Sequence, residues 1–229
     1  MTKSFDAFSK NYNKDLNEAL RLTGYDSSTL TKAKLIKLQQ LFPGLVQLHF
    51  NFLDFGCGIG NLYELVKQFF PYASYTGVDE SGESIIEAQS RFSDSSIFHN
   101  LHSENWKKIQ YDLIFSAGVF HHIPHDEHIK ILKELSGLLN LNGKLVIWEH
   151  NPFNPVTKKI VNDCIFDEDA VLIYPHRMKK NMQKIPLSNI QVVYTTFFPK
   201  SLSCLNILDP YLGWLPLGGQ FITRGEKLW

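Results

Sequence analysis

The chain has few cysteines, no excess of either charge and no long apolar run. Its three cysteines, Cys57, Cys164 and Cys204, are widely spaced and odd in number, which argues against a disulfide framework and indicates a reducing compartment. Lysine plus arginine and aspartate plus glutamate balance at 23 each, so no basic surface for nucleic acid is expected. Residues 1–13 are polar and lack the apolar core of a signal peptide. We therefore expect a cytoplasmic protein with no transmembrane segment.

The length of 229 residues and the hydrophobic content of 44% predict one folded domain with appendages. Apolar residues recur at helical spacing over residues 30–42, and Pro43 ends this pattern. The chain is accordingly divided into an N-terminal helical cap, residues 1–48, and a main domain, residues 49–229.

Strand-like and helix-like segments alternate through the first half of the main domain. Short apolar runs near residues 52–55, 74–78, 96–99, 111–116 and 144–149 suit strands, and the segments 62–69, 84–92 and 126–139 suit helices. Such alternation predicts an α/β fold with a mainly parallel sheet and helices on both faces. Ligands of these sheets bind beyond the carboxyl ends of the strands.

The second half of the main domain carries a looser pattern. Residues 151–188 are expected to form an insert that covers the same edge of the sheet, on the side of a second substrate. Residues 190–198 and 217–223 suit strands, but their Pro- and Gly-rich connection has no room for a regular crossover helix. We therefore expect an antiparallel C-terminal strand pair.

A glycine-rich turn follows the first predicted strand, in Asp54-Phe55-Gly56-Cys57-Gly58-Ile59-Gly60. Gly56, Gly58 and Gly60 allow the backbone to approach a ligand closely and to direct amide groups at it. A dinucleotide fingerprint would place its third glycine one position later, where this chain has Asn61. The spacing therefore weakens the hypothesis of a nicotinamide cofactor. Cys57 is interpreted as a small packing residue within the turn.

Two aspartates flank this turn. Asp54, at the tip of the first strand, would repel a pyrophosphate but suits a ligand that carries an ammonium or a sulfonium group. Asp79 follows the second predicted strand, where a carboxylate can accept hydrogen bonds from both hydroxyls of a ribose. S-adenosylmethionine carries the cationic groups and the ribose in one molecule, and is the predicted cofactor.

These motifs, in this order, resemble the class I S-adenosylmethionine-dependent methyltransferase family over residues 50–149. The resemblance implies a Rossmann-like domain in which Asp54 and the segment from Gly56 to Gly60 form the first motif and Asp79 binds the ribose. It also implies that the segment beginning at Ser116 borders the methionine moiety. The region around Phe5-Asp6 and Tyr12 is expected to close over the cofactor, because N-terminal helices do so in many members.

One segment departs from the family pattern. Many members have a Gly-Asp pair after the third strand, whose acid contacts the adenine amine, whereas this chain reads Asn100-Leu101-His102-Ser103-Glu104. His102, Ser103 and Glu104 all stay open as the residue facing adenine, and Ser103 is included in the predicted cofactor site.

Histidines follow the fourth and fifth predicted strands. His121, His122, His125 and His128 have spacings that can place imidazoles on one helical face, but Pro124 interrupts them and no cysteine completes a tetrahedral set, so no metal is predicted. His150 lies where the fifth strand ends. It is interpreted either as a general base or as a loop histidine bonded to the backbone, and His121 is the second candidate base.

The sequence thus predicts methyl transfer by in-line displacement, with S-adenosylhomocysteine as product. The segments 149–152 and 166–170 resemble methyltransferases of bacterial envelope sugar and glycolipid assembly, so the expected acceptor is a small molecule or a glycan or glycolipid. The alternatives are a nicotinamide-dependent oxidoreductase and a non-catalytic module that binds S-adenosylmethionine. Aromatic residues within 197–216 suit core packing or peripheral membrane contact. The acceptor atom and the oligomeric state stay open.

Overall fold

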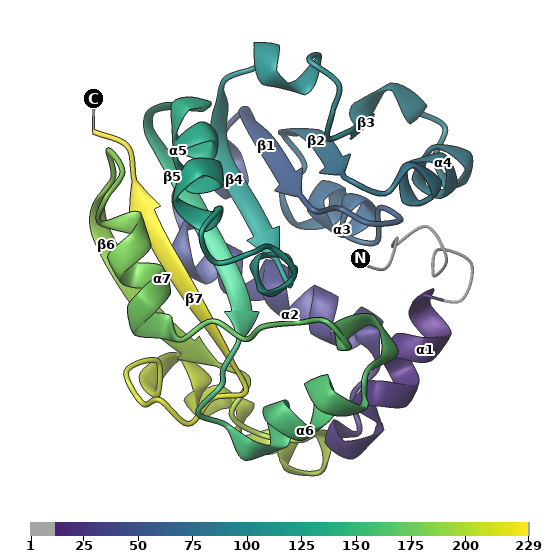
Figure 1. Ribbon diagram of the computed structural model, residues 1–229, viewed down its shortest axis with the longest axis vertical. Helices are drawn as coiled ribbons and strands as arrows, with labels where there is room; N and C mark the ends of the chain where they lie inside the picture. The colour runs from purple at the N-terminus through teal and green to yellow at the C-terminus, as the bar shows by residue number, and fades with distance from the viewer. Residues whose placement is uncertain (1–11, 229) are drawn as a thin grey trace.

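A seven-stranded sheet organises residues 12–228, the part of the chain that the computed structural model describes (Figure 1). Its strand order is β3-β2-β1-β4-β5-β7-β6. The strands are β1 (Phe50–Phe55), β2 (Ala73–Asp79), β3 (Phe98–Asn100), β4 (Tyr111–Ala117), β5 (Leu139–His150), β6 (Ser188–Thr195) and β7 (Gln220–Glu226). Strands β1 to β5 pair in parallel, and β7 is antiparallel to both β5 and β6. The predicted α/β sheet with an antiparallel C-terminal pair is confirmed.

Helices cover both faces of this sheet. They are α1 (Tyr12–Ala19), α2 (Ser27–Leu41), α3 (Tyr63–Phe69), α4 (Gly82–Arg91), α5 (His128–Gly137), α6 (Pro155–Asp163) and α7 (Pro175–Met182). Side chains of α2, α3 and α4 enter one apolar cluster, and those of α5 and α7 enter a second cluster on the other face. The central strands are therefore buried on both sides, which explains their continuous apolar runs.

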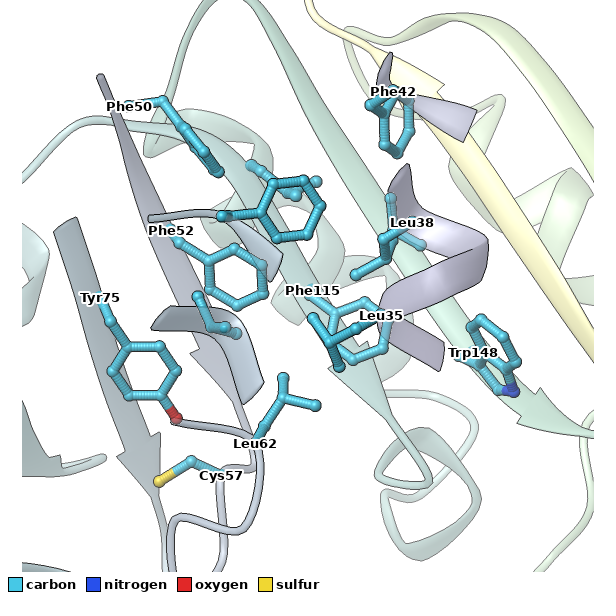
Figure 2. Close-up of a cluster of buried hydrophobic side chains, with 14 of the residues drawn as sticks. Leu35, Leu38, Phe42, Phe50, Phe52, Cys57, Leu62, Tyr75, Phe115 and Trp148 are labelled. Carbon is cyan, nitrogen blue, oxygen red and sulfur yellow. The ribbon is translucent and has the colours of Figure 1, made fainter. Parts of the chain in front are cut away.

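The first apolar cluster is built largely from aromatic rings on the sheet (Figure 2). Phe52 of β1 and Phe115 of β4 lie 6.3 Å apart between ring centroids, and Leu35 and Leu38 of α2 pack over the same face. All four side chains are fully buried. Helix α2 is consequently part of the core, although the sequence assigns it to a separate cap. The predicted division at residue 48 stays a prediction.

Strand β5 begins earlier than the sequence predicted. Its pairing with β4 starts at Leu139, and the register shifts before Lys144 pairs with Leu113. The backbone amide of Asn142 donates to the carbonyl of Lys227 at 2.7 Å, and Asn142 has a φ of 62°. The predicted Asn142-Gly143 turn is therefore an irregularity inside the strand. The carbonyl of Lys227 gives the amide of Asn142 its hydrogen-bond partner there.

No helix within residues 12–228 has both the length and the apolar composition that crossing a bilayer requires. The insert predicted at residues 151–188 contains α6, α7 and the short 3-10 helix η7 (Ile165–Asp167). The connection from β6 to β7 contains the 3-10 helix η8 (Lys200–Tyr211) in place of a crossover α-helix, in agreement with the antiparallel pairing.

The N-terminus of α2 is capped by Asp26, whose Oδ1 accepts the backbone N–H of Thr29 at 2.9 Å. The replacement Asp26→Ala leaves this amide without a partner, so the free energy of unfolding should fall by about 1 kcal/mol. Urea denaturation measures this loss. Asp26→Asn retains a side-chain oxygen for the cap and should lose less than Asp26→Ala; equal losses would contradict a capping role.

Candidate active site at the carboxyl edge of the sheet

The glycine turn after β1 folds back over the end of β2. The backbone amides of Gly56 and Cys57 both donate to the carbonyl of Val78, at 2.8 and 2.9 Å. Gly56, Gly58 and Gly60 have φ values of 81°, 52° and 76°, in the left-handed region that favours glycine. The structure therefore uses all three predicted glycines to shape one tight turn at the carboxyl edge.

Asp79 is held by this turn. Its Oδ2 accepts the backbone N–H of Gly58 at 2.8 Å, and its Oδ1 accepts that of Ser81 at 2.9 Å. Burial raises the pKa of Asp79, and these two amides act against that shift. Each carboxylate oxygen accepts more than one hydrogen bond, so the same group can still receive two hydroxyls of a ligand.

Asp54 lies at the same edge, paired with Gly77 of β2 and with Phe115 of β4. It is buried, and its Oδ2 accepts the hydroxyl of Tyr75 at 2.7 Å. Burial raises the pKa of Asp54 to about 7, while Tyr75 and the ammonium of Lys34 act in the opposite direction and Asp79 adds to the rise. The two aspartates are thus within electrostatic reach of each other, as their predicted common site requires.

Lys34 adds a positive charge to this site, and the sequence did not predict it there. It lies on α2, and its ammonium interacts electrostatically with the carboxylates of Asp54 and Glu149. Burial lowers the pKa of Lys34 in spite of both carboxylates. A lysine within an amphipathic helix carries no signal of such a position, because only tertiary packing directs it toward the sheet edge.

Two serines of the predicted cofactor site have buried hydroxyls without hydrogen-bond partners among residues 12–228. They are Ser116 in β4 and Ser103 in the loop after β3. Buried polar atoms are normally paired, so each of these hydroxyls retains capacity for a further hydrogen bond. Cys57 is also buried, and burial raises the pKa of its thiol, which agrees with a packing role.

The predicted lid lies largely outside the described residues. Phe5 and Asp6 fall within residues 1–11, and Tyr12 begins α1 but its side chain is not among those described. Their place over the cofactor stays a prediction. Figure 1 shows the arrowheads of β1, β4 and β5 pointing toward the side where α1 and α6 lie.

A buried histidine-carboxylate pair joins the ends of β4 and β5. The Nδ1 of His121, in the 3-10 helix η6 (Phe120–His122), lies 2.6 Å from Oε2 of Glu149. The other oxygen of Glu149 accepts the backbone N–H groups of Val119 and Phe120, at 3.1 and 2.8 Å. Glu149 therefore fixes both the loop after β4 and the orientation of the His121 ring.

Asp167 of η7 approaches the same histidine from the insert. Its Oδ1 lies 3.3 Å from Nε2 of His121 and 3.4 Å from Nε2 of His122. Burial alone would lower the pKa of His121, but Glu149 and Asp167 raise it to about 10. At neutral pH the two carboxylates therefore favour a proton on each nitrogen of the His121 ring, and another cation at Nε2 would have to replace that proton.

His150 differs from His121 in its surroundings. Its ring centroid lies 5.2 Å from that of His121, and none of the described residues forms a hydrogen bond with its imidazole. Burial, together with the charge of His121, lowers the pKa of His150 to about 4, so its ring is neutral at neutral pH. Between the two histidines that the sequence proposed as bases, His150 is the one with an available lone pair.

The four histidines that cluster in the sequence fall into two pairs in the structure, with His121 and His122 near Asp167 and His125 and His128 bonded to backbone carbonyls. His128 bonds through Nε2 to the carbonyls of Phe120 and Ile123, both at 2.9 Å, and His125 lies 3.3 Å from the carbonyl of Val171. These two rings stabilise the loop after β4 and stay apart from Asp167. Glu149 and Asp167 received no role in the site from the sequence, although both lie in the segments 149–152 and 166–170 that carry the acceptor resemblance. A carboxylate inside an apolar strand was a usable signal for Glu149, because a buried acid needs a partner.

Comparison with protein families finds a match over residues 53–145 to the family described as "Methyltransferase domain". Among curated proteins, the trans-aconitate 2-methyltransferase of Escherichia coli is 30% identical over 142 residues, which are 62% of this chain and 52% of that protein. The chain therefore spans about half the length of the curated relatives it matches. The family match includes the glycine turn and the two aspartates described above.

Solved structures share the fold at low sequence identity. An S-adenosylmethionine-dependent methyltransferase from Archaeoglobus fulgidus superposes with a TM-score of 0.66 at 16% identity, over 88% of this chain and 95% of that chain. The phosphoethanolamine N-methyltransferase 2 of Haemonchus contortus, solved with S-adenosyl-L-methionine, gives 0.59 at 16% identity, over 86% and 53%. At such identities the likeness establishes the fold alone.

Proposed function

We propose that this chain, which matches the methyltransferase-domain family over residues 53–145 and shares the fold of S-adenosylmethionine-dependent methyltransferases, transfers the methyl group of S-adenosylmethionine to a small-molecule acceptor. The observation that carries the proposal is the pair of carboxylates, the buried Asp54 and the half-buried Asp79, on either side of the glycine turn. A buried carboxylate suits a cationic ligand, and a second one suits the hydroxyls of a ribose.

The residues at the edge of the sheet fit this cofactor. Asp79 would accept the ribose hydroxyls, Asp54 would face the cationic end, and the hydroxyl of Ser116 would pair with a polar atom of the methionine moiety. When bound, S-adenosylmethionine supplies an activated methyl group, whose transfer leaves S-adenosylhomocysteine. The chain then mainly has to align acceptor and methyl group and exclude water, which is worth about 7 to 11 kcal/mol of the barrier.

The acceptor side is proposed to be the cluster formed by His121, Glu149, His150 and Asp167. The neutral His150 can accept a hydrogen bond from an acceptor hydroxyl or amine, whereas His121, held by Glu149 and facing Asp167, orients its neighbours. The relative that acts on trans-aconitate supports a small acceptor. A glycan or glycolipid acceptor and the cytoplasmic location stay predictions from the sequence.

Ligand protection of the purified chain against heat separates this function from its alternatives. S-adenosylhomocysteine should raise the melting temperature, whereas NAD should not, because Asp54 repels a pyrophosphate at the glycine turn. Protection by NAD alone would replace the proposal with an oxidoreductase. Transfer of a labelled methyl group to members of a panel of small carboxylic acids, alcohols and amines would separate an enzyme from a binding module.

Cofactor affinity should depend on pH through Asp54. Its pKa of about 7 in the unliganded protein means that most molecules carry a neutral Asp54 at pH 6, and the cationic ligand requires the ionised form. Affinity for S-adenosylmethionine should therefore be about five- to tenfold weaker at pH 6 than at pH 7.5. Isothermal titration at both pH values measures this. The Asp54→Asn variant should bind weakly with little pH dependence; an equally steep dependence in that variant would exclude Asp54 as the cause.

A further inference from the structure

We propose that His121, His150 and Asp167 form a binding site for a divalent transition-metal ion on the acceptor side of the sheet edge. One nitrogen of each imidazole and one oxygen of the carboxylate all lie within 4.8 Å of one another. Two imidazoles and one carboxylate are a donor set that suits zinc, cobalt, manganese or iron in the divalent state. Ion binding is independent of the proposed methyl transfer, whereas the ion's role toward the acceptor rests on it.

The distance between His121 and Asp167 fits a shared ion better than a direct hydrogen bond. Nε2 and Oδ1 are 3.3 Å apart, whereas a charge-assisted N–H···O bond is about 2.7 to 2.9 Å long. Two donors that each lie about 2.1 Å from one ion, at a tetrahedral angle, are about 3.4 Å apart. The pair is therefore spaced for coordination without a change of backbone, once the ion has displaced the proton from Nε2 of His121.

Glu149 supplies the support that metal-binding histidines usually have. Its Oε2 engages Nδ1 of His121 at 2.6 Å, so the other ring nitrogen, Nε2, is the one presented to Asp167. Glu149 is itself held by the amides of Val119 and Phe120. A carboxylate that fixes the orientation and tautomer of an imidazole is the arrangement found behind histidine ligands of catalytic metals.

The third donor is free to bind. His150 ends β5, is only partly buried, and has no hydrogen bond with any of the described residues. Its ring is adjacent to that of His121, at a centroid distance of 5.2 Å. Three protein donors leave further positions of an ion open for water or for acceptor oxygen atoms, as in catalytic rather than structural sites.

The donors come from three separate segments, η6 after β4, the end of β5, and η7 in the insert. The local spacing of the histidines at 121, 122, 125 and 128 does not predict this site, because its donors come together only in the folded chain. The loop that carries His121 lies against the glycine turn through Val119. An ion in the site would hold an acceptor carboxylate or hydroxyl near that turn and lower the pKa of the hydroxyl.

Cobalt titration tests the site directly, without any methylation assay. The full chain is freed of metal with a chelator and titrated with Co²⁺, whose visible absorption reports nitrogen and oxygen coordination. One saturable Co²⁺ per chain is expected, displaced by Zn²⁺ and not by Mg²⁺, which prefers oxygen donors. His150→Ala and Asp167→Asn should weaken Co²⁺ binding at least about 100-fold, and Glu149→Gln, which changes a positioning residue, about 10- to 100-fold.

His125→Gln is the matched control, because His125 lies in the same loop but outside the donor set. It should bind Co²⁺ like the unchanged chain. Absence of saturable Co²⁺ binding, or equal affinity of Asp167→Asn and His125→Gln when both have native circular dichroism, would overturn the site. The rise in melting temperature with S-adenosylhomocysteine is measured on the same proteins. If the unchanged chain binds Co²⁺ but shows no such rise, the proposed function is overturned and the metal site is supported.

Discussion

Replacing Asp79 with alanine is expected to weaken S-adenosylmethionine binding by about 10²- to 10⁴-fold. The carboxylate would accept two ribose hydroxyls, and a hydrogen bond to a charged group contributes about 1.5 to 3 kcal/mol. The same oxygens also hold the amides of Gly58 and Ser81, so the alanine variant additionally loosens the turn that forms the site. Isothermal titration with S-adenosylmethionine measures the loss.

Asp163→Ala provides the control for this experiment. Asp163 lies on α6, and among the described residues its exposed carboxylate pairs with Lys159 alone, at 3.1 Å, so its removal changes the net charge equally without touching the sheet edge. Binding by Asp163→Ala should equal that of the unchanged chain. An Asp79→Ala protein that is folded and binds S-adenosylmethionine within threefold of the control would remove Asp79 from the cofactor site.

The parts of the site that lie close together in sequence were predictable. The glycine turn and Asp54 leave one strand, and Asp79 leaves its neighbour, so the alternation of strands and helices was sufficient to bring them to one edge. The same alternation predicted the parallel strands and their order along the chain. Local periodicity carries this information because each strand and helix buries its own apolar face.

The parts that depend on distant segments were not predictable. Asp167 lies in an insert without periodicity, and only the packing of that insert brings it to His121. Lys34 reaches Asp54 from a helix that the sequence assigned to a separate cap. The early start of β5 likewise depends on Lys227, at the far end of the chain. In each case the decisive interaction is a tertiary contact, which the local spacing of residues does not predict.

The replacement Gly56→Ala is expected to lower the free energy of unfolding by about 2 to 5 kcal/mol. Gly56 has a φ of 81°, a conformation that costs a residue with a Cβ about 1 to 2 kcal/mol. The Cβ of the new alanine would also lie 2.2 Å from Cγ2 of Val119. Overpacking of this kind adds about 1 to 3 kcal/mol. Gly58→Ala is the matched control, because its φ is also positive but nothing lies within 4 Å of the added atom. It should lose only about 1 to 2 kcal/mol.

A second substitution separates the two contributions. The double variant Gly56→Ala with Val119→Ala lacks the two γ-carbons of Val119, which lie 2.2 and 3.2 Å from the added atom, and retains the backbone strain. Its loss relative to Val119→Ala alone should therefore fall close to that of Gly58→Ala. Urea denaturation of the four variants measures the cycle. If Gly56→Ala lowers the free energy of unfolding equally in the unchanged chain and in the Val119→Ala variant, the turn after β1 does not touch the loop after β4. Such contact matters for function, because it joins the turn proposed to bind the cofactor to the loop that carries His121.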